Sequence, residues 1–197
     1  MVVTIIGVSA VAFAPGIGRA TTDRRVSTAA RELIRIGRRA RADTFGYLRA
    51  HLIWIVPATG TVQLLRGATN SCTLTVADWP TVQGDCAIAT GPGSNRCLEN
   101  LSIAAITTDA TILMYEETLP GPAYSNAVSR ALCYAPNGLV YWGQGANITT
   151  AAGALTDNNS VNGGFVYTLH KGTGAPTVAS RVHRVLFPLG GSARSLR

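Results

Sequence analysis

The chain opens with a stretch in which every position except Thr4 and Ser9 is apolar or small: MVVTIIGVSAVAFAPGIG. As a helix these residues would extend about 27 Å, close to the thickness of a bilayer core. A membrane anchor, a signal peptide and a buried core helix all share this pattern. No basic residue precedes Val2, and Pro15 directly follows the cleavage-like residues 12–14. We therefore favour an anchor with a kink or local break at Pro15.

Residues 19–49 have the periodicity of an amphipathic helix, and Asp23 is a candidate N-cap. An apolar stripe of mostly small residues is formed by Val26, Ala29, Ala30, Leu33, Ile36, Gly37 and Ala40. The opposite face carries Arg24, Arg31, Arg35, Arg38 and Arg39. We expect this helix to continue the apolar one and to pack its stripe against another surface.

After residue 49 the period changes to two, which is typical of β-strands. His51–Val56 and Thr61–Leu65 flank a Thr59-Gly60 turn and predict a hairpin, and Pro136-Asn137-Gly138 predicts a second one. Further strands are expected at 72–77, 101–107, 111–116, 131–135, 139–142, 165–170 and 181–187, and a loop at 149–164. The sequence thus predicts an α+β fold, with a long N-terminal helix packed on an antiparallel β-sheet domain of residues 50–197.

Charge is unevenly distributed. Charged residues make up 14% of the chain and the net charge is +7. Nine arginines lie in residues 19–49. The simplest interpretation is a solvated helix face, such as one close to a membrane surface. The alternative is a site for a polyanion, either nucleic acid or acidic lipid.

The four cysteines are Cys72, Cys86, Cys97 and Cys133. They contain no C-x-x-C pair and have no histidine at zinc-ligand spacing, so no metal site is expected. An even number behind an apolar segment favours two disulfides in an oxidising compartment, with four buried thiols as the alternative. Among three possible connectivities we favour Cys72–Cys86 with Cys97–Cys133.

No residue pattern indicates catalysis, so we expect neither an enzyme nor a cofactor. His51, His170 and His183 match no local metal motif and are interpreted as ordinary strand residues. Glu116 and Glu117 are adjacent in a predicted strand, where they would face opposite sides, and we interpret them as a solvated edge.

The N-terminal residues Val2–Gly7 followed by Ala12–Pro15 resemble the helix of type IV pilins and type II secretion pseudopilins. Ile6-Gly7 and Pro15 keep the spacing of that family. The basic leader, its processing site and the family glutamate are missing, so we expect either a true start upstream of Met1 or a truncation.

Later segments resemble the pseudopilin H (FimT-like) family in particular. They are the helix-to-strand stretch ARELIRIGRRARADTFGYLRAHLIWIV, the strand–turn–strand element Leu132–Tyr141, and the closing hairpin Arg184–Arg194. Residues 67–130 match no element of the family.

The resemblance implies a structural role as a minor pilin or pseudopilin of a type IV pilus or a secretion pseudopilus. Such a subunit waits in the bacterial inner membrane with a periplasmic head, and joins a filament by helix bundling with other subunits, sometimes contacting a secreted cargo. The expected helix–helix contact residues are Val2, Val3, Ile5, Ile6, Gly7, Val8, Val11, Phe13 and Pro15. A major pilin that forms a filament alone is a further alternative.

Some FimT-like pilins bind DNA during uptake through arginines near the C-terminus. This resemblance implies possible DNA contacts by Arg181, Arg184, Arg194 and Arg197. Phosphate contacts of this kind would be independent of sequence and sensitive to salt. The simpler interpretation is a charged terminal hairpin that keeps an edge strand soluble.

Overall fold

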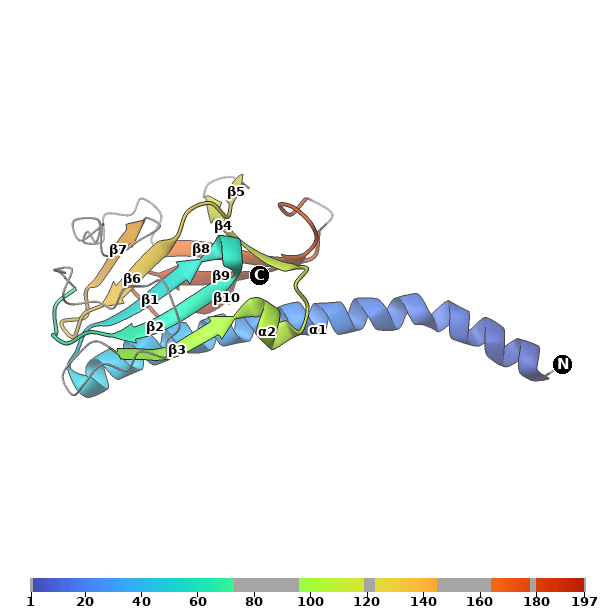
Figure 1. Ribbon diagram of the computed structural model, residues 1–197, viewed down its shortest axis with the longest axis horizontal. Coiled ribbons are helices and arrows are strands. Elements are labelled where there is room, and N and C mark those ends of the chain that lie inside the picture. The colour runs from blue at the N-terminus through green and yellow to red at the C-terminus, as the bar shows by residue number, and fades with distance from the viewer. Residues whose placement is uncertain (1, 73–95, 119–122, 145–163, 178–179, 197) are drawn as a thin grey trace.

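The computed structural model describes residues 2–72, 96–118, 123–144, 164–177 and 180–196, with backbone alone for residues 2–19, 96, 118 and 144. Its longest element is helix α1 (Val2–Tyr47). Figure 1 shows α1 as one gently bent helix whose N-terminal part stands clear of a β-rich head.

Two sequence expectations about α1 are wrong, namely the local break at Pro15, which was the alternative to a kink, and the N-cap at Asp23. The helix continues through Pro15 without the expected break, and Asp23 lies inside it instead of capping it. Proline removes one backbone hydrogen bond, but the neighbouring turns keep theirs, so one proline bends a long helix without ending it. With helical residues on both sides, Asp23 has no helix end to cap, and its carboxylate instead contacts His183 Nε2 at 3.1 Å.

In the described ranges, ten strands form two antiparallel sheets of five. The first sheet has the order β3-β2-β1-β6-β7, with β1 at His51–Val56, β2 at Thr61–Arg66, β3 at Arg96–Ser102, β6 at Arg130–Tyr134 and β7 at Val140–Gln144. The second has the order β10-β9-β8-β4-β5, with β4 at Ile112–Thr118, β5 at Ala123–Ser125, β8 at Gly164–Lys171, β9 at Val182–Pro188 and β10 at Arg194–Leu196.

The predicted β1–β2 hairpin is confirmed, with Val56 opposite Thr61. Its connection is the 3₁₀ helix η1 (Pro57–Thr59), and Gly60 follows in the left-handed conformation, at φ 63°. The predicted β6–β7 hairpin is confirmed as well, with Tyr134 opposite Val140. Proline and glycine at these turns supply the backbone angles that the connections need.

One predicted strand, residues 101–107, is wrong for most of its length. β3 ends at Ser102, and the short helix α2 (Ile103–Thr107) follows. Ser102 Oγ accepts a hydrogen bond from the Ala105 amide at 3.5 Å and caps α2, a local signal that favours a helix start. The predicted strand at 72–77, apart from Cys72, and the predicted loop at 149–164, apart from Gly164 in β8, lie outside the described residues.

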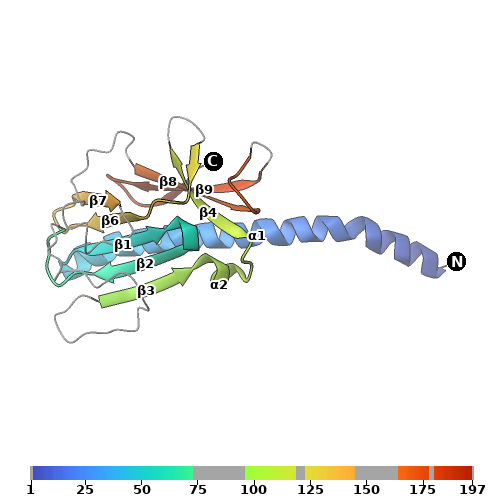
Figure 2. The ribbon, with the colours of Figure 1, turned by 45° about the horizontal axis from the view of Figure 1, so that its top comes forward.

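The predicted apolar stripe of α1 is the centre of the main core. Val26, Ala29, Leu33, Ile36 and Ala40 are all at most 3% exposed. They pack against inward residues of both sheets in a single cluster, and Figure 2 shows α1 running along both sheets. The α+β fold, with the helix packed against antiparallel sheets, is therefore confirmed and is consistent with a pilin-like fold.

The first sheet is buried on its other face too. A second cluster there contains Ala50, Leu52, Trp54, Leu65, Cys72, Ala131, Cys133 and Ala135. Because both faces of its central strand β1 are covered, that strand reads HLIWIV with no alternation of polar and apolar residues.

Gly37 lies where α1 most closely approaches the terminal hairpin. A Cβ there would be 2.5 Å from the Ala193 Cβ and 2.9 Å from the Phe187 ring. We expect Gly37→Ala to lower the free energy of unfolding by about 1–3 kcal/mol, because overpacking outweighs the roughly 1 kcal/mol gain in helix propensity. Urea denaturation of the full chain in detergent measures the change.

The matched control is Gly46→Ala, since Gly46 lies in the same helix and a Cβ there meets no atom within 4 Å. It should be neutral or stabilising by up to about 1 kcal/mol. Adding Ala193→Gly to Gly37→Ala should recover part of the loss. Equal effects of the two glycine substitutions would contradict a close approach at Gly37.

Candidate functional site

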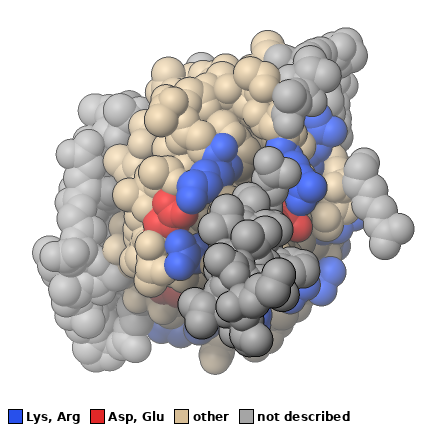
Figure 3. Space-filling model, turned by 90° about the vertical axis from the view of Figure 1, so that its right-hand side faces the viewer, with Lys and Arg blue, Asp and Glu red and all other residues tan. Residues whose placement is uncertain are grey.

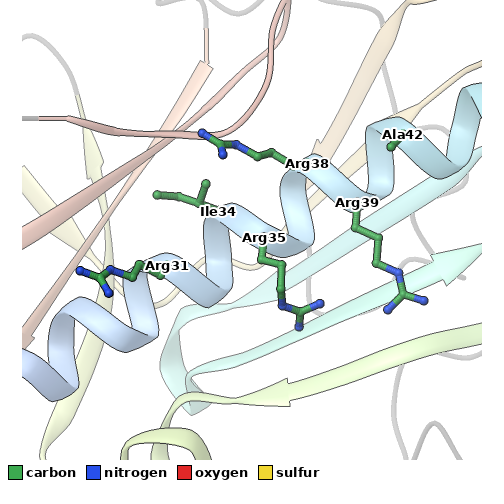
Figure 4. A pocket seen from close by; sticks show the side chains of 6 residues that line it. All are labelled: Arg31, Ile34, Arg35, Arg38, Arg39 and Ala42. Carbon is green, nitrogen blue, oxygen red and sulfur yellow. The ribbon is translucent and has the colours of Figure 1, made fainter.

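The outward face of α1 has a shallow groove of about 570 Å³, and its arginines reach Glu99 of β3 on one side and Ala193, just before β10, on the other. It is lined by Arg31, Ile34, Arg35, Arg38, Arg39 and Ala42. Figure 4 shows these side chains leaving one stretch of helix, with Arg35 and Arg39 directed to one side and Arg38 to the other. We call this surface the α1 groove. The spacing that buries the apolar stripe necessarily places these arginines on the opposite, exposed face.

On the β3 side of the groove, Glu99 receives two arginines. Arg35 donates through both terminal nitrogens to the two Glu99 oxygens, and Arg39 Nη1 donates to Glu99 Oε2 at 2.8 Å. Arg35 Nε also contacts Glu32 at 2.6 Å, and Arg39 Nε contacts Asp43 at 3.3 Å. Hydrogen bonding from Arg35 lowers the pKa of Glu99, although partial burial opposes the shift. This wall of the groove is thus neutralised from within the chain.

The β10 side of the groove is different. Arg38 Nε donates to the backbone carbonyl of Ala193 at 3.3 Å, next to the exposed Arg194. Within the described residues, neither Arg38 nor Arg31 forms an ion pair. This wall therefore keeps its positive charge.

A second charged surface surrounds α1 where it leaves the head. Asp109 contacts Lys171 Nζ at 3.2 Å and Arg25 Nη1 at 3.6 Å. Hydrogen bonds from Thr111, together with that from Lys171, lower the pKa of Asp109 to about 2. Figure 3, which views this end of the head, shows basic side chains beside acidic ones. These partly exposed pairs join α1 and the end of β8 to the loop before β4.

Of the arginines predicted to contact DNA, Arg184 and Arg194 are diagonal neighbours in the β9–β10 ladder, and Arg181 lies farther away. Arg184 Nε donates to Glu117 Oε2 at 2.8 Å. Arg194 pairs with Leu186 in the β10–β9 ladder, and Arg181 lies five residues before Leu186. At strand rise, Arg181 and Arg194 are about 16 Å apart along β9. Arg197 lies outside the described residues. DNA binding by these residues stays a prediction.

The interpretation of Glu116 and Glu117 as a solvated edge is wrong. Glu116 is 9% exposed and accepts hydrogen bonds from Arg130 Nε at 2.8 Å and from Arg130 Nη2 at 2.7 Å. Glu117 accepts from Arg184 and from Thr168 Oγ1 at 2.9 Å. The strand alternation was anticipated, but their basic partners come from β6 and β9, far away in the sequence, and no local pattern indicates them.

The preferred disulfide pairing is also wrong. Cys72 is bonded to Cys133, with a Cα–Cα distance of 5.9 Å, and Cys97 is disulfide-bonded too. Cys86 lies outside the described residues. The preference assumed that Cys72–Cys86 would close one loop and that Cys97–Cys133 would tie a loop to a strand. Instead Cys133, opposite Leu52 in the β6–β1 ladder, meets Cys72 within the second core cluster.

All three histidines have contacts within the head, and His170 Nδ1 lies 3.2 Å from the Lys171 carbonyl. His51 Nδ1 lies 3.0 Å from the Arg49 carbonyl and 3.2 Å from Thr44 Oγ1, while its buried Nε2 has no hydrogen-bond partner among the residues that the structure describes. His183 contacts Asp23. In the part of the chain that the structure describes, no three His, Cys, Asp or Glu side chains gather as a metal site would require.

His51 should make the stability depend on pH. Burial lowers its pKa below 6.5, opposed by the Arg49 carbonyl and Asp43 and helped by Arg66 and Arg39. The unfolded chain therefore binds this proton first as the pH falls below about 6.5, so stability is lost from there down to the folded pKa. The slope is at most about 1.4 kcal/mol per pH unit.

We expect His51→Asn to flatten this part of the profile, because the amide nitrogen can still donate to the Arg49 carbonyl but does not titrate. Urea midpoints measured between pH 5 and 8 for both proteins give the slopes. Identical slopes would show that another group causes the pH dependence.

The predicted helix–helix contact residues, from Val2 to Pro15, all belong to the part of α1 that extends beyond the head in Figure 1. Their side chains are outside the described structure. Among the residues that could be assessed, no helix contains an apolar stretch sufficient to span a membrane.

The chain was compared with protein-family models, curated proteins and solved structures, and nothing matches in any of the three.

Proposed function

We propose that this chain is a minor pilin or pseudopilin: a structural subunit held in a bacterial inner membrane by the start of α1, which assembles with other subunits through that helix. The observation that carries the proposal is the division of α1 into two parts. Residues 26–40 are built into the core of the head, whereas the apolar N-terminal part extends away from it. A helix of that form suits a head displayed on a shared bundle of helices.

The disulfides support an oxidising location for the head, such as a periplasm. The N-terminal resemblance to pilins supports the same assignment. No group in the described residues suggests a reaction, and the proposal contains no catalytic step. Other subunits are the proposed partners, with a secreted cargo as a further one.

The first test places a charge inside the apolar segment. Val8→Arg should shift the full chain from the membrane fraction to the soluble fraction, since arginine near the centre of a bilayer costs about 2.5–3.5 kcal/mol on insertion scales. Ala20→Arg adds the same charge at an exposed position nearer the head and should leave the distribution unchanged. Equal behaviour of the two variants would argue against an anchor.

The second test separates a pilin from other anchored proteins. Mass spectrometry of the native protein from a sheared-filament fraction should find it there with a methylated N-terminal residue. Membrane retention without filament incorporation or methylation would overturn the pilin assignment and leave a membrane-anchored β domain.

A further inference from the structure

The two walls of the α1 groove are unequal in charge. On one wall Arg35 and Arg39 bind the single carboxylate of Glu99, with Glu32 and Asp43 as additional acids. On the other wall Arg31 and Arg38 are exposed, seven residues apart on one row of the helix, and form no ion pair within the described residues. The groove thus contains one carboxylate shared by two arginines four residues apart and, opposite it, two arginines seven residues apart that have no acid within the described residues.

The floor of the groove is apolar. Ile34 and Ala42 lie between the arginines, and Ile34 packs on the main core. Beyond Ala42 three large apolar side chains are exposed: Phe45 at 47% and Tyr47 at 59% in the last turns of α1, and Leu48 at 69% directly after the helix. Phe45 is seven residues after Arg38, so it continues the same row. From Arg31 to Phe45 this surface is about 21 Å long.

We propose that the α1 groove binds a segment of a partner polypeptide that presents carboxylates beside apolar side chains. Its carboxylates would pair with Arg31 and Arg38, as Glu99 pairs with Arg35 and Arg39, and its apolar residues would cover Ile34 and Phe45. Planar guanidinium groups suit carboxylates through paired hydrogen bonds. This proposal does not depend on the chain being a pilin.

A nucleic acid fits the groove less well. Two of its four arginines are already neutralised by Glu99, and Phe45, which continues the row of Arg31 and Arg38, offers no charge to a phosphate backbone. A phosphate-binding surface gains its affinity from the number of unpaired cations. An acidic and apolar polypeptide uses both parts of the surface, and exposed apolar patches next to charged ones are typical of protein interfaces.

The test uses the full chain in zwitterionic lipid nanodiscs, with empty nanodiscs as the blank. The probe is a fluorescent amphipathic peptide of Glu and Leu at helical spacing. We expect saturable binding, weakened about 10- to 100-fold by Arg31→Gln with Arg38→Gln, as loss of charged hydrogen bonds predicts. Phe45→Ser should weaken it too. The control, Arg24→Gln with Arg181→Gln, removes two exposed charges outside the groove and should change affinity less than about twofold.

Three results would overturn the proposal. One is equal affinity for the groove variant and its control. The second is tighter binding of a single-stranded oligonucleotide, lost in the same groove variant, which would assign the groove to nucleic acid. The third is equal binding of polyglutamate, which would show that the apolar floor takes no part. An unchanged thermal melting curve for the groove variant confirms that any loss is local.

Discussion

Glu116→Ala is expected to lower the free energy of unfolding by about 3–5 kcal/mol. The Glu116 and Arg130 side chains are 11% and 14% exposed, and their hydrogen bonds join β4 of the second sheet to β6 of the first. Arg130 also lies 5.1 Å from the ring centre of Phe165 and 5.6 Å from that of Trp142. Removing the carboxylate leaves a guanidinium buried between the sheets without its acid. Urea denaturation of the full chain measures the loss.

Two comparisons isolate the cause. Glu116→Leu combined with Arg130→Met removes both charges at similar volume. The free energy of unfolding of this double variant should be closer to that of the parent than the value for Glu116→Ala is. Asp43→Ala breaks the more exposed pair with Arg39 and should cost less than about 1 kcal/mol. A loss from Glu116→Ala as small as that from Asp43→Ala would show that the sheets do not depend on this pair.

Removal of the Cys72–Cys133 disulfide should cost about 4 kcal/mol. The bond closes a loop of 61 residues in sequence separation, and loop-closure entropy in the unfolded chain sets the magnitude. Both cysteines are almost fully buried in the second core cluster, at 2% and 0% exposure. Cys72→Ala with Cys133→Ala therefore also loses some packing behind β1. The denaturation midpoint of the oxidised double variant gives the effect.

The reduced parent protein provides the comparison. Because reduction also opens the disulfide of Cys97, the reduced parent should be no more stable than the oxidised double variant. A double variant within about 1 kcal/mol of the oxidised parent would mean that the cross-link constrains the unfolded chain little.

Hydrophobic periodicity predicted burial correctly for elements that bury one face. The α1 stripe and the arginine face were both predicted residue by residue, because a 3.6-residue period leaves no other face for Leu33 or Arg35. α2 was missed because Ile103–Thr107 is too short for a helical period to be distinguished from a strand, and its signal is the cap at Ser102.

The ion pairs of the candidate site could not be predicted, because they join residues that local sequence spacing does not relate. Glu99 is 60 residues from Arg39, and Glu116 is 14 from Arg130, and only the sheet order brings each acid to its base. The arginine-rich segment was recognised as a charged helix face or a polyanion site. That Arg35 and Arg39 are neutralised while Arg31 and Arg38 are not could be recognised only once Glu99 of β3 was seen to lie beside α1.

The embedding of α1 in the head has a mechanical consequence. The buried residues from Val26 to Ala40 lie along the helix axis over about 21 Å and contact both sheets. Tension applied to the projecting end would act parallel to this contact and load it in shear, so its apolar contacts would have to yield together instead of one by one. Such a head should resist being pulled from its helix far better than a domain attached by a flexible linker.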